Sequence, residues 1–182
     1  MSGHRLRITI LVALVLTVGL LMVVLNFYPS WSQYARSVFE SLLFITLASI
    51  FAAFWDRASH HPERERILFK IFGIKIRMEH LDRFIAIMFV LVLATPVTLK
   101  GMVIPHFIAT GLGAAGSFFH LIFYYRTGVK LIGNIIGALV GVAAFLVGLL
   151  TDIYPTGVGE LIFAGIMGIH ILSTNKIYPD FN

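Results

Sequence analysis

The sequence predicts an all-α integral membrane protein with six transmembrane helices. The chain of 182 residues is 58% hydrophobic and only 13% charged, with a mean hydropathy of +0.91, which is typical of polytopic membrane proteins. Its apolar residues gather in runs long enough to cross a bilayer. Its basic residues lie between those runs, where Lys and Arg fix the topology.

Six apolar runs are expected to span the membrane within a single domain, residues 1–182. They cover residues 8–28, 37–55, 84–99, 102–125, 131–150 and 157–173. The first run follows Arg5 and Arg7 as a signal peptide would. It is longer than an ordinary signal-peptide core and no small-residue cleavage site follows, so we expect a retained span.

The only long polar segment, residues 56–83, separates the second run from the third. Between Glu63 and Phe72 it mixes large apolar residues with basic ones, namely Ile67, Leu68, Ile71, Arg64, Arg66 and Lys70. This mixture predicts an amphipathic helix that lies on the membrane surface and is interrupted at Gly73. His60 and His61, beside Pro62, are interpreted as solvated surface residues.

Small residues mark the last two runs. In the fifth run Gly133, Gly137 and Gly141 form two overlapping GxxxG units, which predict a helix packed backbone to backbone against a neighbour. The sixth run carries its own stripe of Gly157, Ala164 and Gly168. The fifth run therefore fits either a helix of the same bundle or a second chain, as a homo-oligomer or a partner membrane subunit.

The distribution of charge predicts the orientation. The loops that follow the first, third and fifth runs lie on the same side of the membrane. Of the 14 Lys and Arg residues, only Arg36 and Lys100 fall on that side. By the positive-inside rule, both termini and the 56–83 loop are expected to be cytoplasmic. The net charge of +5 is thus a topology signal directed at anionic membrane lipids, and no nucleic-acid partner is expected.

The fourth run is unusual because it carries polar residues along one side. At about 100° per residue, six small or polar side chains fall within about 40° of one line on a helix. This polar seam consists of His106, Thr110, Gly113, Ser117, His120 and Tyr124. His106 and His120 are expected about 21 Å apart along the helix axis, at 1.5 Å per residue. Ionisable groups are costly against lipid, so we expect the seam to face the interior.

The sixth run supplies further ionisable residues at matching levels. It has the same direction as the fourth, so Glu160 shares the outer level with His106, and His170 shares the inner level with His120. Asp152 lies in the loop before Glu160. The candidate ligand-binding or pathway residues are His106, Thr110, Ser117, His120, Tyr124, Glu160 and His170. The competing interpretation places His106 and Glu160 in the headgroup region and the inner histidines on backbone carbonyls.

Metal and cofactor chemistry is left open by the composition. The chain has no cysteine, which excludes disulfides, thiolate metal sites and cysteine nucleophiles. It has no HExxH or HxxxH motif. Imidazole and carboxylate suit zinc or iron, so a metal is conceivable at Asp82 with His80, or on the inner pair His120 and His170. A single haem on that pair is the most that the histidines within spans permit.

Two family resemblances bear on function. Leu81-Asp82, followed after twelve residues by Thr95-Pro96, resembles the third-span motif of the hemolysin III family, which are membrane proteins with a zinc-site hydrolase architecture. Ala53 stands where that family has a histidine. The resemblance implies a membrane-embedded metal-dependent hydrolase in which Asp82 is a site residue.

The second resemblance is to lipid-binding membrane bundles. The six-span plan, the sequence Arg83-Phe84-Ile85-Ala86 and the aromatic, Arg and Gly residues of 123–128 are similar to the Insig-type sterol and lipid-binding proteins. This resemblance implies a regulatory bundle that binds sterol or another lipid.

From the residues themselves we expect a binding or permeation protein, transporter-like or channel-like, with its polar seam and cavity between the fourth and sixth spans. The ligand would be a small molecule, a lipid or an ion. No catalytic residue is assigned. The alternatives are the hydrolase, the lipid-binding bundle and a structural subunit of a membrane complex.

Overall fold

The computed structural model describes residues 3–25, 40–96, 100–124, 129–151, 153 and 157–176. Within these ranges the chain forms six helices and one β-hairpin. The elements are α1 Gly3–Leu25, α2 Glu40–His60, β1 Ile67–Ile71, β2 Ile74–Arg77, α3 Met78–Ala94, α4 Val103–Tyr124, α5 Val129–Thr151 and α6 Gly157–Lys176. The predicted predominance of helix is confirmed, and the helices follow the six apolar runs with ends shifted by a few residues.

Among the described residues, three helices are long and apolar enough to cross a membrane. The membrane-length stretches are Leu6–Leu25 in α1, Ser41–His60 in α2 and Val103–Phe123 in α4. Shorter apolar stretches occupy Ile135–Ala144 in α5 and Gly157–Ser173 in α6. These stretches are compatible with a membrane protein, and the full set of six spans stays a prediction.

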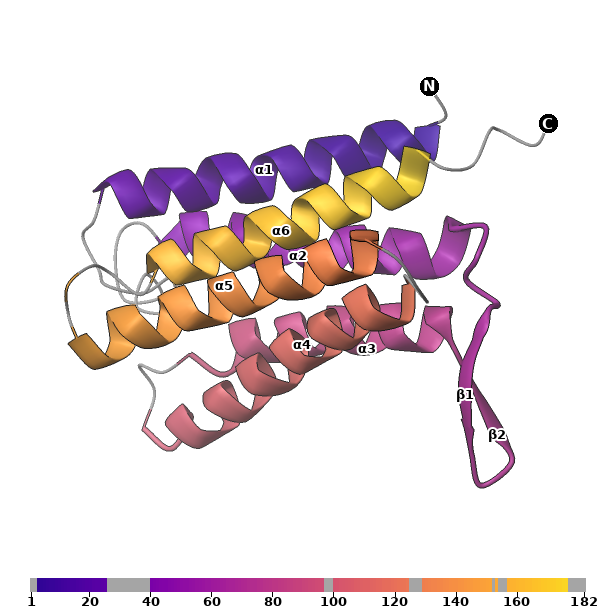
Figure 1. The fold of residues 1–182 in the computed structure, drawn as a ribbon. Helices are drawn as coiled ribbons and strands as arrows, with labels where there is room; N and C mark the ends of the chain where they lie inside the picture. The colour runs from indigo at the N-terminus through magenta and orange to yellow at the C-terminus, as the bar shows by residue number, and fades with distance from the viewer. Residues whose placement is uncertain are drawn as a thin grey trace.

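The helices lie side by side in a ring (Figure 1). Helix α1 packs on α2, α2 on α3 and α3 on α4, while α5 packs on α6 and α6 returns to α1. The contact between α4 and α5 is lighter, and that between α4 and α6 is lighter still. The start of α1, the end of α6 and the β-hairpin share one end of the ring (Figure 1), which is called the hairpin end below.

The amphipathic helix predicted for residues 63–72 is wrong, because this segment enters an antiparallel hairpin. In its register Ile71 pairs with Ile74, Lys70 with Lys75 and Phe69 with Ile76. Its apolar residues alternate with a period of two, which suits a strand. The turn residues Phe72 and Gly73 have positive φ angles of 49° and 82°, as the two central residues of a tight hairpin turn require.

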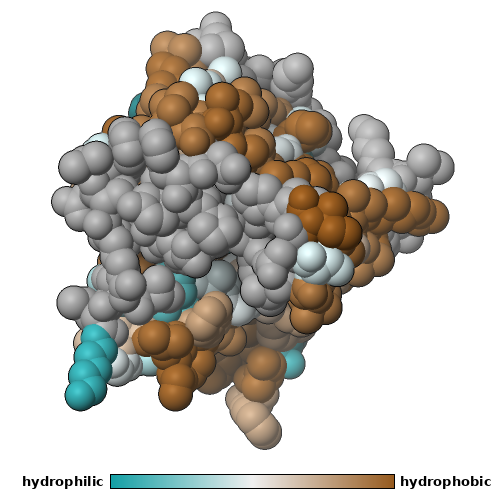
Figure 2. Space-filling model, turned by 90° about the vertical axis from the view of Figure 1, so that its left-hand side faces the viewer, coloured by the Kyte–Doolittle hydropathy of each residue, from teal (hydrophilic) through white to brown (hydrophobic). Residues whose placement is uncertain are grey.

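The core consists of two apolar clusters, one near each end of the ring. The cluster nearer the hairpin end contains Ile8, Val12, Ala53, Phe54, Ile85, Ala86, Leu121, Met167 and Ile171. The other contains Met22, Leu43, Leu47, Val92 and Ala109. Large apolar residues also cover much of the described outer surface (Figure 2), among them Val24 at 70% and Phe107 at 64% exposed. Such a surface suits contact with acyl chains.

Glycines bring α5 close to α6 and α6 close to α1. A Cβ atom at Gly141 of α5 would lie 3.1 Å from the Cα of Phe163 in α6, and one at Gly137 would lie 3.4 Å from Ile166. The close packing predicted from the GxxxG units is therefore confirmed at these two positions, whereas Gly133 faces open space. Gly168 of α6 lies against α1, where an added Cβ would be 2.8 Å from Val12 Cγ1.

Candidate functional site

Four helices each contribute one ionisable side chain to a single buried group near the hairpin end. Arg57 comes from the last turn of α2, Asp82 from the second turn of α3, His120 from α4 and His170 from α6. All four residues have 0% exposure. Burial of charged groups is costly unless they are paired, so their mutual contacts decide what the group does.

Three of these residues form a continuous line, the Asp–His–His cluster (Asp82, His120 and His170). His120 Nε2 lies 2.9 Å from Asp82 Oδ1, an ion-pair contact within hydrogen-bonding distance. The other nitrogen of His120, Nδ1, lies 2.9 Å from His170 Nε2. The two imidazole rings meet edge to face, with centroids 5.0 Å apart. Both nitrogens of His120 are thus engaged, and it bridges α3 to α6.

The chemistry of the partners gives this line a direction. A carboxylate only accepts hydrogen bonds, so a neutral His120 presents its Nε2–H to Asp82. Its Nδ1 is then the acceptor for the Nε2–H of His170. The two contacts lead from His170 through His120 to Asp82. A proton added at His170 can therefore move along the line by exchange between the two rings.

Arg57 supplies the positive charge beside the cluster. Its Nε lies 3.8 Å from Asp82 Oδ1. His61 follows four residues later, is also buried at 1% exposure, and donates its backbone N–H to the Arg57 carbonyl at 2.9 Å. The His61 ring accepts the backbone N–H of Glu63 through Nδ1 at 3.2 Å. The chain leaving α2 is therefore folded over the buried group.

Apolar side chains enclose the Asp–His–His cluster. The Phe54 ring meets the His120 ring edge to face, with centroids 5.9 Å apart. Ile85 of α3, Leu121 of α4 and Ile171 of α6 are each at most 4% exposed and belong to the same apolar core. Electrostatic and hydrogen-bond interactions are stronger in such surroundings than in water.

The predicted seam residues of α4 have different surroundings. Ser117 is buried and donates its hydroxyl hydrogen to the Gly113 carbonyl at 2.9 Å, while Thr110 is half-buried. A Cβ at Gly113 would lie 3.4 Å from Met88 Cβ, so the seam packs against α3 over much of its length. It was expected to face α6, which it meets through His120. The Tyr124 side chain lies outside the described residues.

The outer-level residues are not brought together in the described part of the chain. His106 is buried, and its Nδ1 lies 2.9 Å from the Thr95 carbonyl oxygen at the end of α3. Glu160 is half-buried in the first turn of α6. Asp152 lies outside the described residues. His106 thus joins α4 to α3 through a backbone carbonyl, a partner that the competing interpretation gave to the inner histidines and not to His106.

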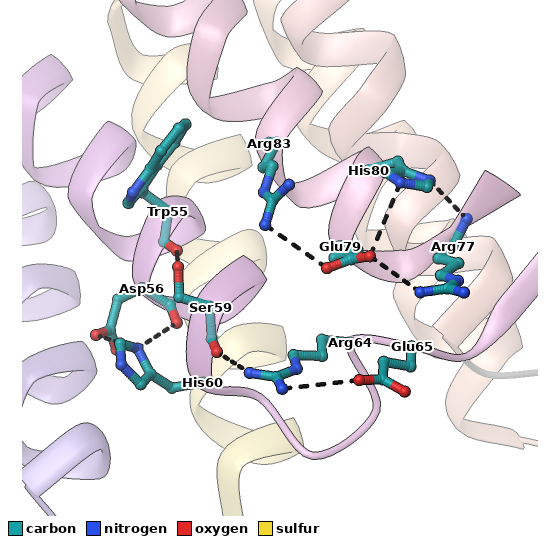
Figure 3. Close-up of polar contacts among 10 residues, drawn as sticks. All are labelled: Trp55, Asp56, Ser59, His60, Arg64, Glu65, Arg77, Glu79, His80 and Arg83. Atoms are coloured by element: carbon teal, nitrogen blue, oxygen red, sulfur yellow. Dashed lines mark hydrogen bonds and ion pairs between the residues drawn. The ribbon is translucent and has the colours of Figure 1, made fainter.

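His80 and Asp82 point to different places. The His80 side chain is 45% exposed, and its Nδ1 accepts the Arg77 backbone N–H at 3.1 Å. It belongs to a surface group in which Glu79 also contacts Arg77 at 3.5 Å and Arg83 at 3.6 Å (Figure 3). Asp82, two residues on from His80, is directed into the ring of helices instead.

The histidine pair is also too close for a haem between its rings. Two imidazole nitrogens on opposite sides of one metal ion lie about 4 Å apart, because each bond is about 2 Å long, whereas those of His120 and His170 lie 2.9 Å apart. Across the described ranges, no group of three or more His, Asp or Glu side chains is arranged to hold a metal ion. A haem on this pair would require the two rings to separate.

Sequence reasoning missed Arg57 and His61. Arg57 was interpreted as a boundary charge and His61 as a solvated residue, because the second span was ended at Trp55. The missed signal is the continuing helical period. Phe54, Arg57, Ala58 and His61 recur at intervals of three and four, which places them on one face of a helix.

No protein-family model, curated protein or solved structure matches the chain.

Proposed function

We propose that the protein is a six-span integral membrane protein that binds and conducts protons, with the Asp–His–His cluster as its relay. The observation that supports this proposal is the uninterrupted line of two 2.9 Å contacts between three buried ionisable side chains. Ionisable residues inside membrane helices are costly and usually mark a pathway or a proton relay. Histidine is the side chain whose proton exchanges most readily near neutral pH.

Each residue has a distinct role in the proposed relay. His170 receives the proton and passes it from Nε2 to His120 Nδ1, and His120 then releases its other proton from Nε2 to Asp82. The positive charge of Arg57 compensates the Asp82 carboxylate, from which its Nε lies 3.8 Å. Phe54 and the apolar side chains around it exclude bulk water, which would otherwise carry the proton past the relay.

The polar seam of α4 is the proposed connection to the opposite end of the ring. His106, Thr110 and Ser117 provide hydrogen-bonding groups on the side of α4 that carries His120, over about 21 Å at 1.5 Å per residue. A proton leaving Asp82 is proposed to pass along these groups, at the contact between α3 and α4. By the positive-inside rule, we place both termini and the hairpin end on the cytoplasmic side.

Proton flux into liposomes tests the proposal. The purified protein is reconstituted with a trapped pH-sensitive dye, and a potassium diffusion potential drives the protons. The variants His120→Gln and Asp82→Asn keep the size and much of the hydrogen bonding of the original side chains. Both are expected to lower the flux by roughly tenfold or more, because an amide cannot carry a proton through the relay.

His80→Gln is the matched control, since it makes the same chemical change at an exposed histidine in the same part of the chain. Its flux is expected to equal that of the unaltered protein. Circular dichroism and gel filtration establish that each variant is folded. The proposal fails when the unaltered protein conducts no faster than empty liposomes at either polarity, or when folded His120→Gln and Asp82→Asn retain full flux. The cluster would then be a packing network.

A further inference from the structure

The β-hairpin extends beyond the ring of helices. Its strands run across the direction of the helices, and in Figure 1 its tip lies beyond α3 and α4. Because helices of a membrane bundle run through the bilayer, an element that runs across them at one end would lie along the membrane surface. In the proposed membrane orientation, the tip of this hairpin lies over lipid rather than over the protein.

The two faces of the hairpin differ in chemistry. Side chains alternate between the faces of a strand, and directly paired residues share a face. The register therefore puts Phe69, Ile71, Ile74 and Ile76 on one face. Lys70 and Lys75 form a pair on the other face. A two-stranded hairpin has no sheet or helix of its own to cover an apolar face, and Ile71 and Ile74 are 47% and 64% exposed.

Contacts with α4 show which face is turned toward the helices. The Phe69 ring lies 5.5 Å from the Phe123 ring, between centroids. Nearby, Arg66 donates from Nη2 to the Phe123 carbonyl at 2.6 Å. The apolar face, to which Phe69 belongs, is therefore directed toward the helices, that is, toward the hydrocarbon side. Past the edge of the ring, the same face meets acyl chains.

The tip adds a bulky apolar group at a position where one is rarely found. Phe72 is fully exposed, at 101%, and its φ angle of 49° lies in the left-handed region. Asn, Asp and Gly are the residues that favour this place in a hairpin turn. A strained conformation that presents a phenyl ring to the surroundings points to a function for that ring.

The lysine pair indicates the kind of surface that the hairpin meets. Like charges directly opposite each other on neighbouring strands repel, as Lys70 and Lys75 do in this register. Negative phosphates close to both ammonium groups relieve the repulsion. Lysine side chains beside a membrane extend their charged ends to the headgroups while their methylene stems cover apolar groups.

We propose that the hairpin is a membrane-surface anchor that binds acidic phospholipids. Ile71, Phe72 and Ile74 enter the boundary between headgroups and acyl chains, and Lys70 and Lys75 bind lipid phosphates. This inference requires the helices to cross a membrane, but it does not depend on the proton relay. It keeps the membrane-surface location predicted for this segment, with a hairpin in place of a helix.

The absence of cysteine allows a label to be placed at one position. Phe72→Cys and the control Glu65→Cys, at an acidic side chain that is 68% exposed, are each coupled to the same polarity-sensitive dye. The proteins are placed in nanodiscs of phosphatidylcholine with or without phosphatidylglycerol, which also contain a lipid-attached quencher. Quenching at position 72 is expected to exceed that at position 65 about twofold or more, and to be greater with the acidic lipid.

Charge reversal tests the role of the lysines. Lys70→Glu and Lys75→Glu are added to the Phe72→Cys protein, which carries the same dye at position 72. Because both proteins carry this dye, any insertion driven by the dye itself contributes equally to the two measurements. Its quenching is expected to fall toward that of position 65. Equal quenching at positions 72 and 65 overturns the proposal. So does quenching at position 72 that changes neither with the acidic lipid nor with the charge reversal. Shielding of position 72 only on addition of another protein would instead identify a protein-binding hairpin. None of these outcomes alters the loss of flux that is expected for His120→Gln and Asp82→Asn.

Discussion

Replacement of Asp82 by alanine is expected to lower the free energy of unfolding by about 3–5 kcal/mol. The substitution removes the negative charge 3.8 Å from Arg57 Nε and the oxygen 2.9 Å from His120 Nε2. Because Arg57 is 0% exposed, its guanidinium would stay buried without that partner. Unfolding in detergent micelles, followed by circular dichroism against temperature or denaturant, measures the loss.

Two further variants show whether the buried Arg57 charge, left without Asp82, causes this loss of unfolding free energy. Arg57→Met combined with Asp82→Leu replaces both charges with apolar groups, which is often neutral or stabilising for a buried pair. The double variant is expected to be more stable than Asp82→Ala alone. Glu65→Ala, which breaks an exposed pair with Arg64, should change stability by no more than about 0.5 kcal/mol. Equal losses in Asp82→Ala and the double variant would contradict this account.

Gly168→Leu is expected to separate α6 from α1 and to disturb the histidine pair. A Cβ at this position would lie 2.8 Å from Val12 Cγ1, and the short, branched Val12 side chain cannot move away without a shift of its helix. Overpacking of this kind costs about 1–3 kcal/mol. Because His170 lies two residues further along α6, its contact with His120 should lengthen. A lower unfolding temperature together with a lower proton flux is the expected result.

Gly165→Leu is the matched control for this substitution. It introduces the same side chain on the same helix, at a glycine with nothing within 4 Å of an added Cβ. Stability and flux are expected to stay close to those of the unaltered protein. Similar losses at positions 165 and 168 would mean that the effect comes from replacement of a helical glycine and not from the contact with α1.

The helices and their apolar faces were predictable because long uncharged runs have few alternative structures. The meeting of His120 and His170 was also foreseen, from the shared direction of the fourth and sixth spans. The hairpin was not. In a window of about ten residues, mixed apolar and basic side chains satisfy both a helical and a strand period. The alternation of Ile67, Phe69 and Ile71 before Phe72-Gly73 was the signal that favoured a strand.

The partners of the histidines depend on the order of helices around the ring. Spacing along α4 shows which side chains share a face, but it does not show that α3 is the neighbour on that face. Asp82 was therefore singled out only through a family resemblance and as a conceivable metal ligand with His80, and its contact with His120 was not foreseen. Arg57 was hidden for a related reason, since a charge near the end of a span usually lies in the interface.

The hydrogen bond from Arg66 to the Phe123 carbonyl has a mechanical consequence. Phe123 lies in the last turn of α4, three residues after His120, and the bond measures 2.6 Å. Any displacement of the strands that follow Arg66 therefore pulls on the backbone that carries the central imidazole. Binding of acidic lipid at the hairpin and binding of a proton at the Asp–His–His cluster would then be coupled. Each would change the free energy of the other by the same amount.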